Sequence, residues 1–137
     1  IHMKKLLIIF IFSLGVISQS IAGEYAYECT IGNVYTLTDD GKIKETGQNW
    51  QGIFQGERFY VSRLNGEIVG STLPTALADE IRIINPGSSE YDFQTLAVFK
   101  TDSGVEWQVL SIEEYKEGKI KPFSAFTAAG ITSGVCE

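Results

Sequence analysis

Carboxylates and two cysteines are the side chains of this sequence best suited to chemistry, because histidine is almost absent. The single histidine, His2, precedes the first methionine. Without an imidazole in the remaining chain, a Ser-His-Asp triad, a Cys-His pair and a histidine-ligated zinc or copper site are excluded. The sequence also lacks a G-x-S-x-G elbow and the glycine-rich loops that bind phosphate. It therefore predicts no catalytic residues, no metal site and no cofactor.

Acidic residues stand next to each other at three places, Asp39-Asp40, Asp79-Glu80 and Glu113-Glu114. A glycosidase needs two carboxyls that face each other across a cleft. Neighbours in a strand point to opposite faces, so an adjacent pair does not provide that geometry. We interpret the three pairs as solvated surface charge. The sequence therefore predicts that the protein is not an enzyme, with a carboxylate-based hydrolase as the less favoured alternative.

The first 22 residues have the pattern of a secretory signal peptide. Met3 is the expected start, and the two residues before it are an addition. Two lysines and an apolar run of 12 residues follow, and Ser20-Ile21-Ala22 then places small residues where a signal peptidase reads them. The run is shorter than the roughly 20 residues of a membrane span. We expect residues 1–22 to be cleaved, leaving residues 23–137 as one domain, periplasmic or secreted, with no membrane span.

The expected mature domain is strongly acidic. Residues 23–137 keep nine Lys and Arg against 17 Asp and Glu, a formal charge of −8. A field of this sign disfavours nucleic acid as a partner and would attract a basic one.

The two cysteines, Cys29 and Cys136, lie near the two ends of this domain. In an oxidising compartment an even cysteine count is typical of a disulfide. Two free thiols or a metal site are the alternatives, although two cysteines without histidine make a poor zinc set. We expect a Cys29–Cys136 disulfide that ties the first strand to the last.

Most of the domain consists of short runs that alternate with period two, separated by turn residues every 8 to 15 positions. The pattern predicts an all-β fold, a single antiparallel β-barrel or β-sandwich of roughly 8–10 short strands closed by the disulfide. Residues 71–80 are the exception and are expected to form a short helix with Pro74 in its first turn. Trp107 belongs to a strongly alternating run and is expected in the core.

The strongest local signal is Asn65-Gly66, which stands between two strand-forming runs. Both residues tolerate positive φ, so they predict a two-residue type I′ turn with Leu64 opposite Glu67. One face of this predicted hairpin carries the apolar residues Phe59, Val61 and Ile68.

Residues 46–57 contain three glycines and two large aromatic residues, Trp50 and Phe54, and are expected to form a loop or an irregular edge strand. Rigid aromatic residues on a loop are typical anchors of a binding surface. The alternative is that both rings fold back as lids over the core. Tyr60 and Arg63 on the next strand would add a stacking ring and a guanidinium. These four residues form the predicted binding surface.

Two resemblances carry implications for function. The stretch from Phe59 to Gly70, with Tyr27-Glu28-Cys29 before it and Gly134-Val135-Cys136 after it, resembles small exported bacterial proteins of unassigned function. Tyr27-Glu28-Cys29 and Cys136 are also similar to the frame of the periplasmic and membrane-bound inhibitors of c-type lysozyme. The inhibitory Ser-Ala-Ser-Gly motif of that family has no counterpart here.

We therefore expect an exported, non-enzymatic binding protein of the bacterial cell envelope. Its partner is an unknown protein or small molecule, basic if the net charge guides binding. An inhibitor of a basic hydrolase such as lysozyme is the first alternative.

Overall fold

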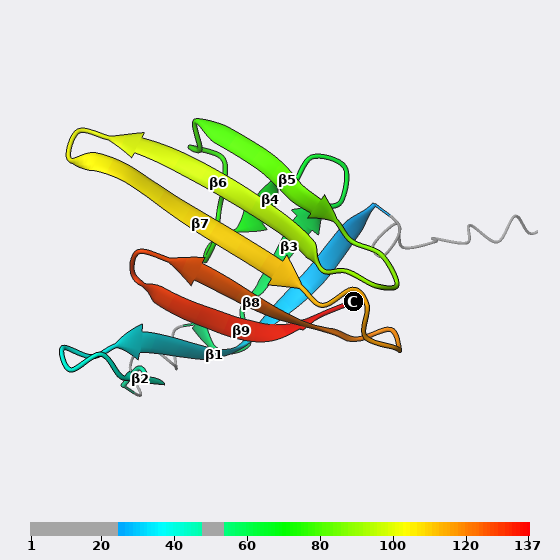
Figure 1. Cartoon of the computed structure of the whole chain (residues 1–137), viewed down its shortest axis with the longest axis horizontal. Coiled ribbons are helices and arrows are strands. Elements are labelled where there is room, and N and C mark those ends of the chain that lie inside the picture. The colour runs from blue at the N-terminus through cyan, green and yellow to red at the C-terminus, as the bar shows by residue number, and fades with distance from the viewer. Residues whose placement is uncertain (1–24, 48–53) are drawn as a thin grey trace, which may run out of the picture.

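A computed structural model describes residues 25–47 and 54–137. Nine strands run through these residues (Figure 1). Their bounds are β1 Ala26–Leu37, β2 Ile43–Glu45, β3 Arg58–Ser62, β4 Ile68–Gly70, β5 Glu80–Pro86, β6 Phe93–Thr101, β7 Gly104–Ile112, β8 Lys121–Thr127 and β9 Gly130–Cys136. No helix in the described ranges is long and apolar enough to cross a membrane.

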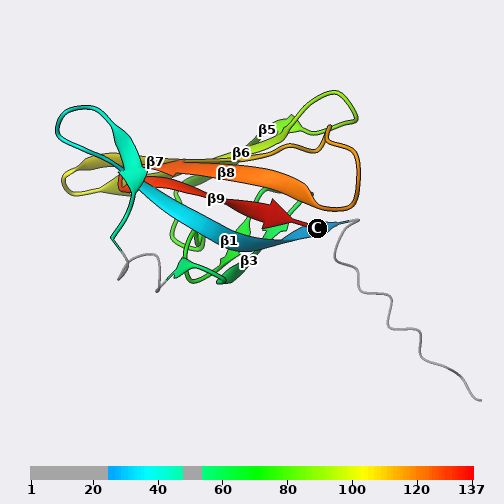
Figure 2. The same ribbon diagram turned by 90° about the horizontal axis from the view of Figure 1, so that it is seen from below.

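The strands form one antiparallel sheet in the order β4-β3-β1-β9-β8-β7-β6-β5, with β2 paired to the far end of β1. The sheet curls into a half-barrel, so that β3 and β4 lie behind the layer formed by β5 to β9 (Figures 1 and 2). The predicted all-β antiparallel class is thereby confirmed. The two edges of the curled sheet are β4 and β5.

The core fills the concave side of the curl, where alternate residues of each strand meet. Two ring pairs join its opposite walls: Tyr27 lies 5.3 Å from Phe93, and Phe59 lies 5.2 Å from Phe123, measured between ring centroids. The buried cluster consists of Tyr27, Cys29, Ile31, Phe59, Val61, Ile68, Leu73, Phe93, Leu110, Ile112, Phe123, Ala125 and Cys136.

The predicted disulfide is confirmed. Cys29 of β1 and Cys136 of β9 lie directly opposite each other and are bonded, although 107 positions separate them in sequence. Because β1 and β9 are neighbours in the middle of the sheet, the bond joins the first and last described strands inside the fold.

The hairpin around Asn65-Gly66 forms with a longer turn than predicted. Val61 lies opposite Ile68, and the strands separate after Ser62, so the two-residue turn was wrong. Only Gly66 has positive φ, +79°, whereas a type I′ turn needs positive φ at both central residues. The register moved by two positions, an even number, and the predicted buried face is therefore preserved.

The predicted helix over residues 71–80 is wrong, because the segment runs as a series of turns. Leu73 is buried in the core, and its carbonyl accepts a hydrogen bond from Gln108 at 2.9 Å. The Thr75 hydroxyl accepts a hydrogen bond from the Ile68 N–H at 2.8 Å. A helix this short has little stability of its own, so these tertiary contacts decide the conformation.

Trp107 is also placed differently from the prediction. It lies on the outer face of β7 with 47% of its surface exposed, while Gln108, Leu110 and Ile112 face the core. Alternation shows that Val105, Trp107 and Val109 share a face, but it does not show which face is inside. Gln108 can be buried because its amide bonds the Leu73 carbonyl.

Candidate functional site

The rim of the sheet has a notch at the turn between β8 and β9. Ala128 and Ala129 form this turn. Figure 1 shows this turn ending short of the β6–β7 turn on one side and of the β1–β2 turn on the other. The pairing explains why: β8 ends with Thr127 opposite Gln108, whereas β7 continues back to Gly104 alongside β6. We call this gap, with the β7 and β1 segments that border it, the notch.

The backbone of β7 presents unpaired groups to the notch. Successive residues of an antiparallel strand direct their N–H and C=O groups to opposite neighbours. Glu113 donates its N–H to the Pro122 carbonyl at 2.9 Å, so odd-numbered residues of β7 face the β8 side. Val105 and Trp107 therefore face that side too. The register places Ala128 of the turn opposite Trp107, and Val105 lies beyond the turn. Within residues 25–47 and 54–137, no strand pairs with this edge.

The opposite border of the notch is the end of β1. Thr38 donates its N–H to Lys42 on the β2 side, so Leu37 directs its backbone to the β9 side, where the register places Ala129 of the turn opposite it. Two strands separate β7 from β1 in the sheet. At a strand spacing of about 4.8 Å, the two borders are therefore about 14 Å apart, the width that β8 and β9 take up.

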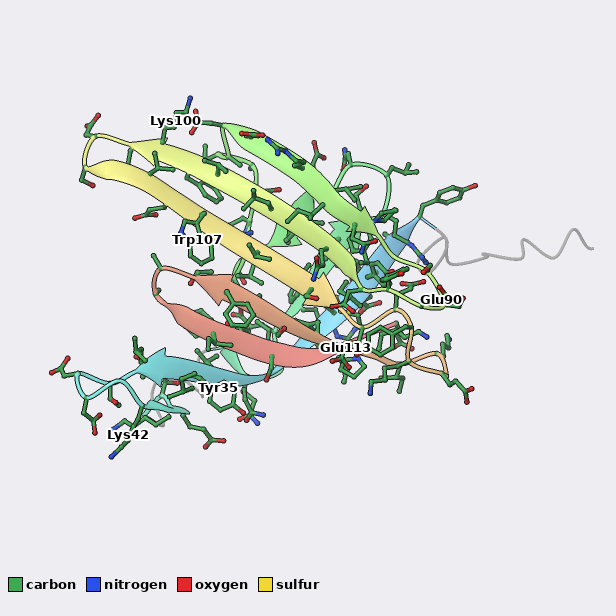
Figure 3. The ribbon with its side chains drawn as sticks, viewed as in Figure 1. Tyr35, Lys42, Glu90, Lys100, Trp107 and Glu113 are labelled. Atoms are coloured by element: carbon green, nitrogen blue, oxygen red, sulfur yellow. A yellow bond between two sulfur atoms is a disulfide. The ribbon has the colours of Figure 1, made fainter. Side chains whose placement is uncertain are left out.

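On the outer face of the sheet the notch opens into an apolar hollow of about 450 Å³. Trp107 forms one wall, and Leu37 and Ile43 form the other. Both aliphatic side chains are more than half exposed. Figure 3 shows the Trp107 side chain on the viewer's side, between β7 and the β8–β9 turn. Phe126 and Ile131 line the rest of the hollow.

On the inner face a smaller hollow of about 240 Å³ borders the same turn. Phe99, Glu106 and Gln108 line it together with the turn residues. Glu106 is exposed, and it forms no ion pair with another described residue. The notch thus has an apolar hollow on one face and an acidic side chain on the other.

The apolar wall of the notch continues across the outer face as a row of directly paired residues. This row is Leu96, Val109, Phe126, Ile131 and Tyr35. The next row away from the notch is polar and consists of Gln94, Ser111, Ser124 and Ser133. The apolar surface therefore ends sharply, one row from the notch.

The predicted binding residues do not form one surface in the described structure. Trp50 lies outside the described residues. Phe54 is partly buried and packs against the core. Tyr60 is 46% exposed on the outer face of β3, whereas Arg63 lies 4.7 Å above the ring of Tyr27. Whether any of the four contacts a partner stays a prediction.

Arg63 belongs to a partly buried ion pair. Its guanidinium donates to Glu114 at 2.7 Å. Burial raises the pKa of Glu114, and the charge of Lys121 offsets part of that rise. The Tyr27 hydroxyl and the second Glu114 oxygen are buried without a hydrogen-bond partner in the described part of the chain. The cluster joins the turn after β3 to the turn after β7, a structural role.

The adjacent carboxylates also have local structural contacts. Asp40 bonds Thr38 and Lys42, which lowers its pKa. Asp79 accepts the backbone N–H of Lys100 at 2.6 Å. No group of three or more His, Cys, Asp or Glu lies close enough to hold a metal ion in ranges 25–47 and 54–137.

The sequence did not indicate the notch residues Leu37, Ile43 and Trp107 as a group. They lie on two hairpins that become neighbours of the β8–β9 turn only in the folded sheet. The signal that was available is strand length. The alternating runs that flank the Asp102-Ser103 turn are longer than the runs that flank the Ala128-Ala129 turn. Comparison with models of protein families, with curated proteins and with solved structures found no match to this chain.

Proposed function

We propose that this protein is an exported, non-enzymatic binding protein of the bacterial cell envelope and that the notch is its binding surface. The observation that carries the proposal is the cluster of exposed apolar side chains around one hollow. Trp107, Leu37 and Ile43 are each 47 to 68% exposed and line the same space. Exposed apolar residues scattered singly are ordinary, whereas a group of them around a concavity is typical of a binding site.

Export is supported by the signal-peptide pattern of residues 1–22 and by the Cys29–Cys136 disulfide. Binding rather than catalysis is supported by the carboxylates, since Asp40, Asp79 and Glu114 each have a structural partner. The notch offers shape, apolar area and backbone hydrogen-bonding groups, the features with which proteins recognise a partner.

Replacing Trp107 by alanine should weaken binding and leave the fold stable. Tyr60→Ala is a matched control, because Tyr60 is an aromatic residue of the outer face with nearly the same exposure, 46% against 47%. The measurement is capture of partners from a periplasmic extract by the immobilised domain, with thermal melting of each variant. Trp107→Ala should weaken capture of a given partner by tenfold or more, as for an aromatic hot spot, while Tyr60→Ala captures it as the wild type does.

The opposite result, loss with Tyr60→Ala and none with Trp107→Ala, would contradict the proposal and favour the surface that contains Tyr60. A lysozyme activity assay is run beside it. Inhibition by both the wild type and Trp107→Ala would show that the protein acts on a basic hydrolase through a surface other than the notch.

A further inference from the structure

We infer that the protein also binds a small uncharged molecule, an apolar body with one hydrogen-bonding group, in a hollow on the concave side of the sheet. The inference goes beyond the proposed function and does not depend on it. We call this hollow the inner pocket, and its lining includes Val34, Phe54, Thr72, Leu73, Thr127 and Thr132. The turn after β8 borders both the inner pocket and the notch, but Trp107 and Leu37 do not line the inner pocket.

Strand register explains why a space remains here. The register of β1 shifts between Ile31 and Asn33, so that Val34 lies opposite the buried Thr132 of β9. Thr127, the last residue of β8, lies opposite Gly130, which has no side chain. The sheet therefore contributes few large side chains to this end of its concave side.

Two apolar residues from outside the strands cover this part of the sheet. Phe54 precedes β3 and packs against the core, and Leu73 follows β4 and is buried. They leave a volume of about 130 Å³ between themselves and the sheet. An engineered apolar cavity of roughly 150 Å³ holds a benzene molecule, so the inner pocket has the size for one small ring.

The Thr132 hydroxyl gives the inner pocket its one polar handle. Thr132 is 8% exposed, and its hydroxyl forms no hydrogen bond with another residue of ranges 25–47 and 54–137. Among the described residues, fully buried polar atoms without a partner occur at Tyr27 and Glu114, so the Thr132 oxygen keeps access to the pocket that it lines. Buried polar groups are normally bonded, and a ligand atom would supply the missing partner.

The other two hydroxyls of the lining are already in use. Thr72 donates its hydroxyl hydrogen to Glu57, and Thr127 donates its own to the Gly130 carbonyl. A water molecule is held firmly only with two to four polar partners, and the free side-chain group here is Thr132 alone. Water in the inner pocket is therefore readily displaced by an apolar molecule.

A second hollow gives access to the inner pocket. It has a volume of about 360 Å³ and shares Val34, Phe54 and Ala129 with the inner pocket, while Thr36 and Thr46 line its outer part. None of the described residues that line either hollow is charged. A charged ligand group would lose its hydration without an ionic partner, so the ligand is uncharged.

Phenol and toluene are the two probes, because they have nearly the same shape and differ by a hydroxyl against a methyl group. Each is titrated into the isotopically labelled protein, and the amide shifts are followed by NMR. Phenol should bind saturably at millimolar concentration or below. The shifts should be largest at Val34, Leu73 and Thr132 and small at Val105 and Val109, which border the notch.

Thr132→Val tests the role of the hydroxyl, because it replaces that group by a methyl of similar size. The variant should weaken phenol binding about fivefold or more and leave toluene binding as tight as before or tighter. Its melting temperature should not fall, since the hydroxyl has no partner to lose. If the variant did not fold, the map of amide shifts in the wild type would still decide where the probes bind.

Thr95→Val is the matched control. Thr95 is also buried, at 3% exposure, but it belongs to β6 and does not line the inner pocket. The same substitution there should leave the ratio of phenol to toluene affinity unchanged within twofold.

Three results would overturn the inference. The first is no saturable binding of either probe at millimolar concentration. The second is an unchanged ratio of phenol to toluene affinity in Thr132→Val. The third is binding that Trp107→Ala removes, with shifts centred on Val105 and Val109, because the probes would then occupy the notch and the proposed function would stand without an inner pocket.

Discussion

Single residues around the notch are held by their cross-strand neighbours. Trp107 lies opposite Val98 of β6, at an alternate position where the two side chains approach most closely. The ring also borders the hollow that Phe126 lines.

Glu114 allows a test of how burial acts on one carboxylate. Burial raises its pKa above the ordinary value of 4.5. The folded state then holds the proton more tightly than the unfolded state, so the stability from this group is full below about pH 4.5. It is lost as the pH rises through the folded-state pKa.

Glu114→Gln cannot titrate, so the free energy of unfolding of the wild type should fall relative to the variant between pH 4 and 7. Urea titrations at each pH measure this difference, and the other carboxyls cancel because both proteins share them. If the wild type instead becomes more stable relative to Glu114→Gln as the pH rises, the attraction of Arg63 outweighs burial and lowers the pKa of Glu114.

At the scale of elements, alternation and turn residues predict most strands and their buried faces. The pattern fails where contacts between residues far apart in sequence determine the conformation of a segment. Residues 71–80 form turns because Leu73 and Thr75 bond β7 and β4. The turn at Asn65-Gly66 is longer because buried Gly66 packs close to Thr95 of β6. Gln108 and Thr95 are distant in sequence from the segments that they contact, so local propensity does not include their effect.

The pairing of β1 and β9 depends on a close approach at Gly134. A Cβ there would collide with the Thr30 carbonyl of β1 and lie 2.7 Å from Phe123. Gly134→Ala should therefore lower the free energy of unfolding by about 1–3 kcal/mol, as overpacked sites do.

Gly32→Ala is the control for Gly134→Ala, because its added Cβ would make only ordinary contacts, 3.6 Å or longer. Urea denaturation of both variants gives the comparison. Equal stability of the two would mean that β1 and β9 are farther apart at Gly134 than described.

At the scale of the whole molecule, strand order creates the candidate site. The disulfide joins β1 and β9 in the middle of the sheet and closes a loop of 107 positions. In the chain-entropy model such a link stabilises the fold by about 4–5 kcal/mol. It fixes β1 beside β9, and the short β8–β9 hairpin then leaves the notch between β7 and β1. The sequence predicted the bond but not the notch, because an alternating pattern contains no information on which hairpins become neighbours.

Amide hydrogen exchange of the free domain tests the account of the notch most directly, since the account requires an unpaired edge of β7 at Val105. The Val105 amide should exchange nearly as fast as in an open chain, while the amide of Val109, which pairs with β8, is protected. Strong protection of Val105 in the free protein would contradict the account, because another part of the chain would then already be paired with that edge.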